Sequence, residues 1–322
     1  MNFSHRNGVK YFEMSLNPYK LITEKTSENA NKLIRSVLES FKKAAESTNV
    51  KFGVLLQYQK GMKEEANNLL AQCRELKEDN VVGLELAGTE FNIEEVVAED
   101  SETVDLLLFH PDDIAIFEEA KAAKIHRSVH AGEFGPSEAV FQAIEKLSAE
   151  RIVFGYSVLQ DESLYHDCIN NKIHFCTAPS VSLVNGSVGQ TRSWGRRNIS
   201  LKHLVTGLDH FYHPIVQFAE ENVSFSVNTG LPVITGTGLD QEISLLKSWG
   251  LTETHLTKGG FSIFYSAKAW QTLTKVGSSR LPDFCGGKHN EPFLKAVFNA
   301  ARAAFLEDKK KKELQKELRK VY

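Results

Sequence analysis

Residues 127–156 carry the pattern that decides the fold, and they read RSVHAGEFGPSEAVFQAIEKLSAERIVFGY. Residues 127–130 form a short β-rich run that ends at Ala131-Gly132. Residues 137–147 are typical of a helix, and residues 151–156 form a second β-rich run. A strand, a helix and a strand in this order predict two parallel neighbouring strands.

The same alternation extends in both directions along the chain. It predicts further strands at residues 9–16, 50–56, 81–86, 173–178 and 223–227, and further helices at 27–46, 64–76, 114–123 and 162–170. Seven strands separated by helices indicate an α/β fold with a parallel sheet, and their even spacing favours a (β/α) TIM-type barrel. We expect residues 1–322 to form a single domain.

Two stretches interrupt this rhythm. Residues 185–209 and 259–290 are rich in glycine and show no clean periodicity, so we expect two loop insertions. The tail after Phe293 has a helical pattern, and residues 309–322 predict an amphipathic, highly charged last helix. Its lysine run is interleaved with Glu313 and Glu317, which is typical of a solvated face.

Composition narrows the classes of function. The formal charge is 38 minus 41, or −3, so charge gives no reason to expect binding to nucleic acid or to an anionic membrane. No apolar run is long enough to span a bilayer. The four cysteines lie far apart, as reduced thiols would, and residues 1–8 show no signal-peptide pattern. We therefore expect a cytoplasmic protein.

Short polar motifs follow several predicted strands, where a parallel barrel gathers its functional side chains. They include Glu85-Leu86-Ala87-Gly88, His130-Ala131-Gly132-Glu133 and Asn228-Thr229-Gly230-Leu231-Pro232. A strand-end histidine beside a glutamate suits metal-assisted hydrolysis, in which an imidazole binds the metal and a carboxylate moves a proton. In isolation, the same two residues also fit a satisfied polar pair without catalytic function.

In this order and spacing the motifs resemble those of the adenosine deaminase family, over nearly the whole chain apart from the two insertions. The resemblance implies that His130 is a zinc ligand, that Glu133 handles the proton reaching the purine ring, and that the backbone of Gly88 contacts the purine. It also implies a purine nucleoside, adenosine or inosine, as the ligand. Tyr11-x-Glu13 with Pro18 resembles the end of the family's second strand.

The chain departs from the family pattern where the metal is held. The family's first strand carries His-x-His, which supplies two zinc ligands, and no such motif occurs here. The histidine that orients the attacking hydroxide is replaced by Phe154. The zinc-binding aspartate and the purine-contacting aspartate are replaced by Gly230 and Leu231. The resemblance therefore predicts an incomplete barrel, N-terminally truncated, with its first strand missing and its zinc site degenerate.

Other histidines offer little compensation for these losses. His126 precedes His130 by four residues, which on a strand separates the rings by about 13 Å. His210 and His213 lie beside an expected insertion rather than at a strand end. Because catalytic zinc usually takes three protein ligands and a water molecule, we expect this chain not to hold zinc stably. In a dry pocket without the cation, we predict a raised pKa for Glu133.

Two functional hypotheses follow. The first is an adenosine deaminase-like protein that is inactive or severely impaired and retains nucleoside binding. The second is an active zinc enzyme whose site is completed by a missing N-terminal segment or by a partner chain. A barrel short of one strand also leaves two edges exposed, which favours homo- or hetero-oligomers. The gap left by the missing strand could equally be covered by an insertion, or it could reflect an incomplete gene model. A third hypothesis is that the chain is the unstable product of a degenerate gene.

Overall fold

The structure is a computed structural model that describes residues 11–48, 50–88, 108–188, 213–221, 223–230, 238–251 and 304–321. The predicted insertion at 259–290, most of the one at 185–209, and residues 9 and 10 of the first predicted strand lie outside these ranges. Leu231 and His210 also lie outside them. No helix within the described ranges is long and apolar enough to cross a membrane.

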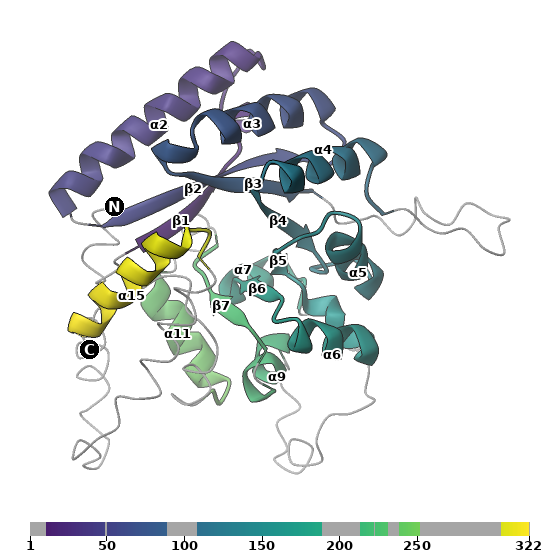
Figure 1. Cartoon of the computed structure of the whole chain (residues 1–322). Helices are drawn as coiled ribbons and strands as arrows, with labels where there is room; N and C mark the ends of the chain where they lie inside the picture. The colour runs from purple at the N-terminus through teal and green to yellow at the C-terminus, as the bar shows by residue number, and fades with distance from the viewer. Residues whose placement is uncertain are drawn as a thin grey trace, which may run out of the picture.

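Seven parallel strands form one sheet in chain order, which confirms the predicted strands and their sequence. The strands are β1 (Tyr11–Leu16), β2 (Lys51–Gln59), β3 (Val81–Ala87), β4 (His126–Ala131), β5 (Arg151–Phe154), β6 (His174–Thr177) and β7 (Phe225–Val227). Among the described residues no pairing joins β7 to β1. These seven strands form a curled half-barrel (Figure 1).

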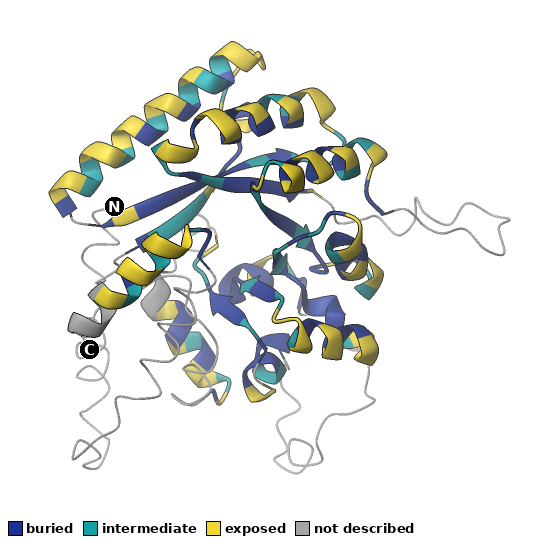
Figure 2. Ribbon diagram, in the orientation of Figure 1, coloured by how far each residue is buried: buried dark blue, intermediate teal, exposed yellow. Residues whose placement is uncertain are grey.

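Helices cover the outer face of this sheet and turn their apolar sides toward it (Figure 2). In α2, Ala30, Ile34 and Leu38 recur every four residues and all are buried, as expected for one face of a helix. The described helices are α2 (Ser27–Thr48), α3 (Lys63–Glu75), α4 (Pro111–Ala122), α5 (Ser137–Glu145), α6 (Glu162–Asn170), α7 (Pro179–Val184), α9 (Pro214–Glu220), α11 (Leu239–Ser248) and α15 (Asp308–Val321).

The structure corrects two of the predicted boundaries. The predicted strand at 151–156 ends at Phe154, because Phe154 and Gly155 adopt φ angles of 71° and 70° and turn the chain out of the extended conformation. A short 3-10 helix, η4 (Tyr156–Gln160), follows. The tail was predicted to be helical after residue 293, but residues 304–307 are not helical, and α15 begins only at Asp308.

Residues 304–307 depart from a helix where Phe305 closes the base of the half-barrel. The Phe305 amide donates a hydrogen bond of 2.7 Å to Oε1 of Glu13 in β1. Its ring lies 3.7 Å from the guanidinium carbon of Arg151 in β5 and stacks on His126 of β4 at 4.6 Å. Arg151 in turn binds Glu13 at 2.6 Å. One residue of the C-terminal segment, through its backbone amide and its ring, thus contacts three strands.

Candidate functional site

The predicted site residues that the structure describes lie at the carboxyl ends of strands, where barrel enzymes place their chemistry. His130 is the fifth residue of β4, and Glu133 follows two residues after that strand ends. Gly88 directly follows β3, and Phe154 is the last residue of β5. Gly230 comes three residues after β7.

His130 is paired with a buried carboxylate that the sequence motifs did not single out. Its Nε2 lies 3.2 Å from Oε1 of Glu85, a β3 residue that is 3% exposed. Gln57 and Ser128 also donate hydrogen bonds to this carboxylate, at 2.8 and 2.9 Å. Burial would raise the pKa of Glu85, but the charge of His130 and hydrogen bonds from His130, Ser15 and Gln57 outweigh it and hold the pKa at about 2. Glu85 is therefore ionised and engages His130.

Phe154 lies next to the pair formed by His130 and Glu85 and gives this side of the site an apolar surface. Its ring meets the His130 ring edge to face at 5.7 Å and lies 5.9 Å from Tyr156. A phenyl ring neither donates nor accepts a hydrogen bond. Its positive φ of 71° is unusual for a bulky residue and costs about 1–2 kcal/mol. The backbone here keeps a strained turn at the mouth of the barrel.

Gly230 occupies a place with no room for a side chain. Its φ is 56°, and a Cβ atom added there would lie 2.5 Å from Cγ2 of Val181 and 2.9 Å from Cβ of Ala178. Real Cβ contacts are not that close, so α7 would have to move before this position could carry a carboxylate. Gly88 is similarly constrained, because its φ is 70° and an added Cβ atom would lie 2.7 Å from Oε1 of Gln59.

Glu133 is held by a residue from another element. The side chain of Asn185, at the C-terminal end of α7, donates through Nδ2 to Oε1 of Glu133 at 2.5 Å. Glu133 is 7% exposed, whereas Asn185 is exposed at the surface. Residues 185–188 form a turn that follows α7, although the sequence placed them in an insertion. The predicted rise in the pKa of Glu133 stays a prediction.

The histidines considered as substitute ligands lie elsewhere. His126 binds Glu150 at the opposite end of β4 from His130. His213 is fully buried, accepts a hydrogen bond from the Ile215 amide, and stacks on Trp249. Within the described ranges no group of three His, Cys, Asp or Glu side chains could hold a metal ion. Around His130, the described residues therefore do not fit a catalytic zinc ion.

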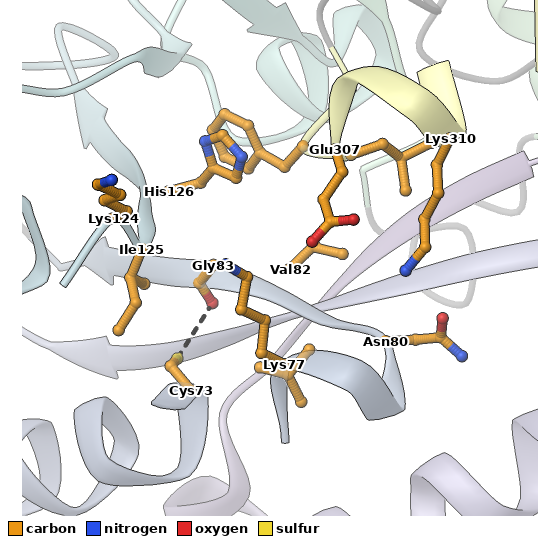
Figure 3. Close-up of a pocket in the computed structure, with 13 residues that line it drawn as sticks. Cys73, Lys77, Asn80, Val82, Gly83, Lys124, Ile125, His126, Glu307 and Lys310 are labelled. Atoms are coloured by element: carbon orange, nitrogen blue, oxygen red, sulfur yellow. Dashed lines mark hydrogen bonds between the residues drawn. The ribbon is translucent and has the colours of Figure 1, made fainter. Parts of the chain in front are cut away.

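A pocket in the structure lies away from these residues, at the N-terminal ends of β3 and β4. It is lined by Cys73, Lys77, Asn80, Val81, Val82, Gly83, Lys124, Ile125, His126, Phe305, Leu306, Glu307 and Lys310. Figure 3 shows Glu307 and Lys310 on one side and Cys73, hydrogen-bonded to the Gly83 carbonyl, on the other. It contains no predicted site residue, so it belongs to the base of the barrel.

A family model described as adenosine deaminase matches residues 1–194 of the chain. The chain belongs to the adenosine deaminase family. An adenosine deaminase from Xenopus laevis is 27% identical over 329 residues, covering 98% of this chain and 73% of the relative. An adenosine deaminase from Gallus gallus is 24% identical over 98% of this chain and 72% of the relative. The aminodeoxyfutalosine deaminase of Streptomyces coelicolor is 26% identical over 86% of this chain and 62% of that protein.

Solved structures of similar fold agree with this family. An adenine deaminase from Arthrobacter aurescens has a TM-score of 0.58 at 17% identity, covering 99% of this chain and 75% of that one. An amidohydrolase from Burkhoderia ambifaria with bound Zn has a TM-score of 0.63 at 16% identity, covering 99% and 73%. These likenesses support the incomplete α/β barrel of this adenosine deaminase family member.

Sequence reasoning missed two residues of the site, Glu85 and Asn185. Glu85 stands inside the quoted motif Glu85-Leu86-Ala87-Gly88, and its position one strand away from His130 was a usable signal. Asn185 carried no such signal, because it lies 52 residues from Glu133 in a stretch without periodicity.

Proposed function

We propose that this chain is an adenosine deaminase-like protein of purine nucleoside metabolism that binds a nucleoside without deaminating it at family rates. The family reaction converts adenosine and water to inosine and ammonia. The observation that carries the proposal is the surroundings of His130. Its imidazole engages Glu85, Phe154 stands beside it, and Gly230 has no room for a carboxylate.

The chemistry of these groups supports impaired catalysis. A catalytic zinc ion usually needs three protein ligands and supplies a nucleophilic hydroxide by lowering the pKa of bound water. Of the family ligands, the described residues offer only His130. The ring of Phe154 cannot orient a hydroxide by hydrogen bonding. Zinc would therefore be held weakly, and the attack on C6 of the purine would lose its nucleophile.

Nucleoside binding needs less than catalysis does. Small-molecule sites are mostly apolar, with a few polar groups that fix orientation. Gly88 presents backbone at the strand end, Glu133 presents a carboxylate, and Phe154 presents an aromatic wall. These three features support retained binding of adenosine or inosine. The proposal includes a cytoplasmic location and a single domain over residues 1–322.

The test combines metal content, activity and binding on the purified chain. We expect elemental analysis to give well under one zinc per chain, and ammonia release from adenosine to stay near background with added zinc. Calorimetry should detect heat with adenosine or inosine at up to millimolar concentration. Glu133→Ala should weaken that binding, while Glu138→Ala, on the neighbouring helix α5, serves as the matched control. Absence of heat with both nucleosides would remove the binding proposal.

A second candidate is an active zinc deaminase completed by another segment or a partner chain. The missing pairing between β1 and β7 among the described residues favours it, because an unpaired strand edge can accept another strand. The same edges would support homo- or hetero-oligomers. Stoichiometric zinc together with metal-dependent ammonia release would establish this candidate in place of the first.

A further inference from the structure

The pocket at the base of the barrel combines an uncharged, buried interior with a charged opening. Its volume is about 80 Å³, which is room for several water molecules or for a small organic molecule. The buried residues of its described lining are Cys73, Val81, Gly83, Ile125 and Phe305. The Cys73 thiol already donates to the Gly83 carbonyl at 3.5 Å, so this interior suits an apolar group. The exposed residues of the described lining are all charged, and they are Lys77, Lys124, Glu307 and Lys310.

Three of these four charged side chains are cationic, and each comes from a different part of the chain. Lys77 follows α3, Lys124 precedes β4, and Lys310 lies in the first turn of α15 (Figure 3). Within the described ranges none of the three forms an ion pair. Only the tertiary structure brings these lysines to one opening, where they can attract an anion together.

Glu307 is the acidic residue among the charged residues at this opening. Three cations less this one carboxylate leave a net charge of +2. His126 in the wall is paired with Glu150 and does not change this balance. The exposed charges are screened by salt, so they favour an anion without holding it tightly. The affinity of a ligand must therefore also depend on the part that enters the apolar interior.

We propose that this pocket binds a small organic anion, a carboxylic acid with a short aliphatic tail. The carboxylate lies at the opening among the three lysines, and the tail packs against the buried lining. A compact anion such as inorganic phosphate would leave the apolar interior without an apolar partner. The pocket lies at the opposite end of the strands from His130, so this proposal does not rest on nucleoside binding.

The expected affinity follows from the size of the pocket. An acid of about six to eight non-hydrogen atoms should bind with a Kd on the order of 1 mM. Each methylene group that enters the interior should tighten binding roughly three- to four-fold, until the interior is filled. The lining includes residues 305–307 and 310, so a bound acid should also slow the local opening of residues 304–321.

The experiment measures binding of acetate, propionate, butyrate, hexanoate and inorganic phosphate to the full chain by calorimetry at constant ionic strength. We expect affinity to rise from acetate to butyrate, phosphate to bind more weakly than butyrate, and butyrate to slow amide hydrogen exchange in residues 304–321. Replacing Lys77, Lys124 and Lys310 together by Gln should weaken butyrate binding on the order of tenfold. Glu307→Gln removes the opposing charge and should tighten it about two- to ten-fold.

A control variant changes the net charge by the same amount away from the pocket. It replaces Lys20, Lys32 and Lys146 by Gln, all of them exposed and absent from the pocket lining, and it should bind butyrate as the wild-type chain does. An equal loss of binding in the two triple variants would overturn the proposal, because it would reveal diffuse attraction to surface charge. Affinity that does not depend on tail length, phosphate binding as tight as butyrate binding, or no binding of any acid at tens of millimolar would each overturn it as well.

Discussion

Replacing Glu13 by Gln tests whether the base of the half-barrel depends on one buried ion pair. Glu13 binds Arg151 at 2.6 Å, and each side chain is only 5% exposed. Glu13 also accepts from the Tyr11 hydroxyl at 2.8 Å and from the Phe305 amide at 2.7 Å. The substitution keeps the shape of the side chain and removes its charge, so the buried Arg151 loses its carboxylate.

The expected loss in the free energy of unfolding follows from the burial of the two side chains rather than from the distance between them. Breaking a buried ion pair by removing one partner costs about 3–5 kcal/mol, because a charge remains in a poorly solvated place. For a chain of this size that corresponds to a fall in melting temperature of roughly 4–7 °C. Urea denaturation followed by circular dichroism gives the free energy of unfolding, and calorimetry gives the melting temperature.

The chain contains a matched control for this measurement. Arg35 and Glu75 form an ion pair with the same 2.6 Å separation, but their side chains are 51% and 55% exposed. Glu75→Gln should cost less than about 1 kcal/mol, as exposed ion pairs do. A similar cost for both substitutions, or a cost below about 1 kcal/mol for Glu13→Gln, would refute the view that this pair secures the base.

Four further outcomes are expected. The pKa of Glu85 is about 2 against an ordinary 4.5, so its contribution of roughly 3 kcal/mol to the free energy of unfolding is present above pH 4.5 and is lost as the pH falls toward 2. In urea denaturation, Glu85→Gln should therefore make the free energy of unfolding less dependent on pH between 4.5 and 2. Burial, aided by nearby positive charge, lowers the pKa of His174 to about 3, so His174 removes stability as the pH falls from 6.5 toward 3, and His174→Gln should reduce that slope. Phe305→Ala should cost about 3–5 kcal/mol and speed amide hydrogen exchange in α15. Gly230→Asp should lower the melting temperature without raising zinc content, because its Cβ would collide with Val181.

The sheet was predictable because parallel strands carry a local signal. β2 is buried on both faces from residue 52 to residue 56, so these five residues read as a run without a polar side chain between polar stretches. The end of β5 was not predictable in this way. Residues 151–156 have a uniform β pattern, and only the positive φ angles of Phe154 and Gly155 end the strand. The helices α7, α9 and α11 were not predicted; α7 and α9, with six and seven residues, are too short for a clear periodicity.

Other features of the structure could not be predicted because they depend on contacts between residues that lie far apart in the sequence. Phe305 meets Glu13 across 292 positions, and no local pattern predicts that a residue of the tail closes the base of the barrel. Asn185 meets Glu133 across 52 positions. Tertiary structure alone brings these pairs together, and each pair places a hydrogen-bond donor against a buried carboxylate.

The pairing of His130 with Glu85 changes what the presence of His130 implies about function. Glu85 is buried and ionised, so removing the imidazole beside it would leave this carboxylate with one hydrogen-bond partner fewer and would destabilise the fold. That requirement would keep a histidine at position 130 in a chain that had lost catalysis altogether. Phe154 and Gly230 occupy positions without such a partner, and there the family's polar groups are absent. Among the described residues His130 has a hydrogen-bond partner in the fold itself, so its presence alone is no argument for a working metal site.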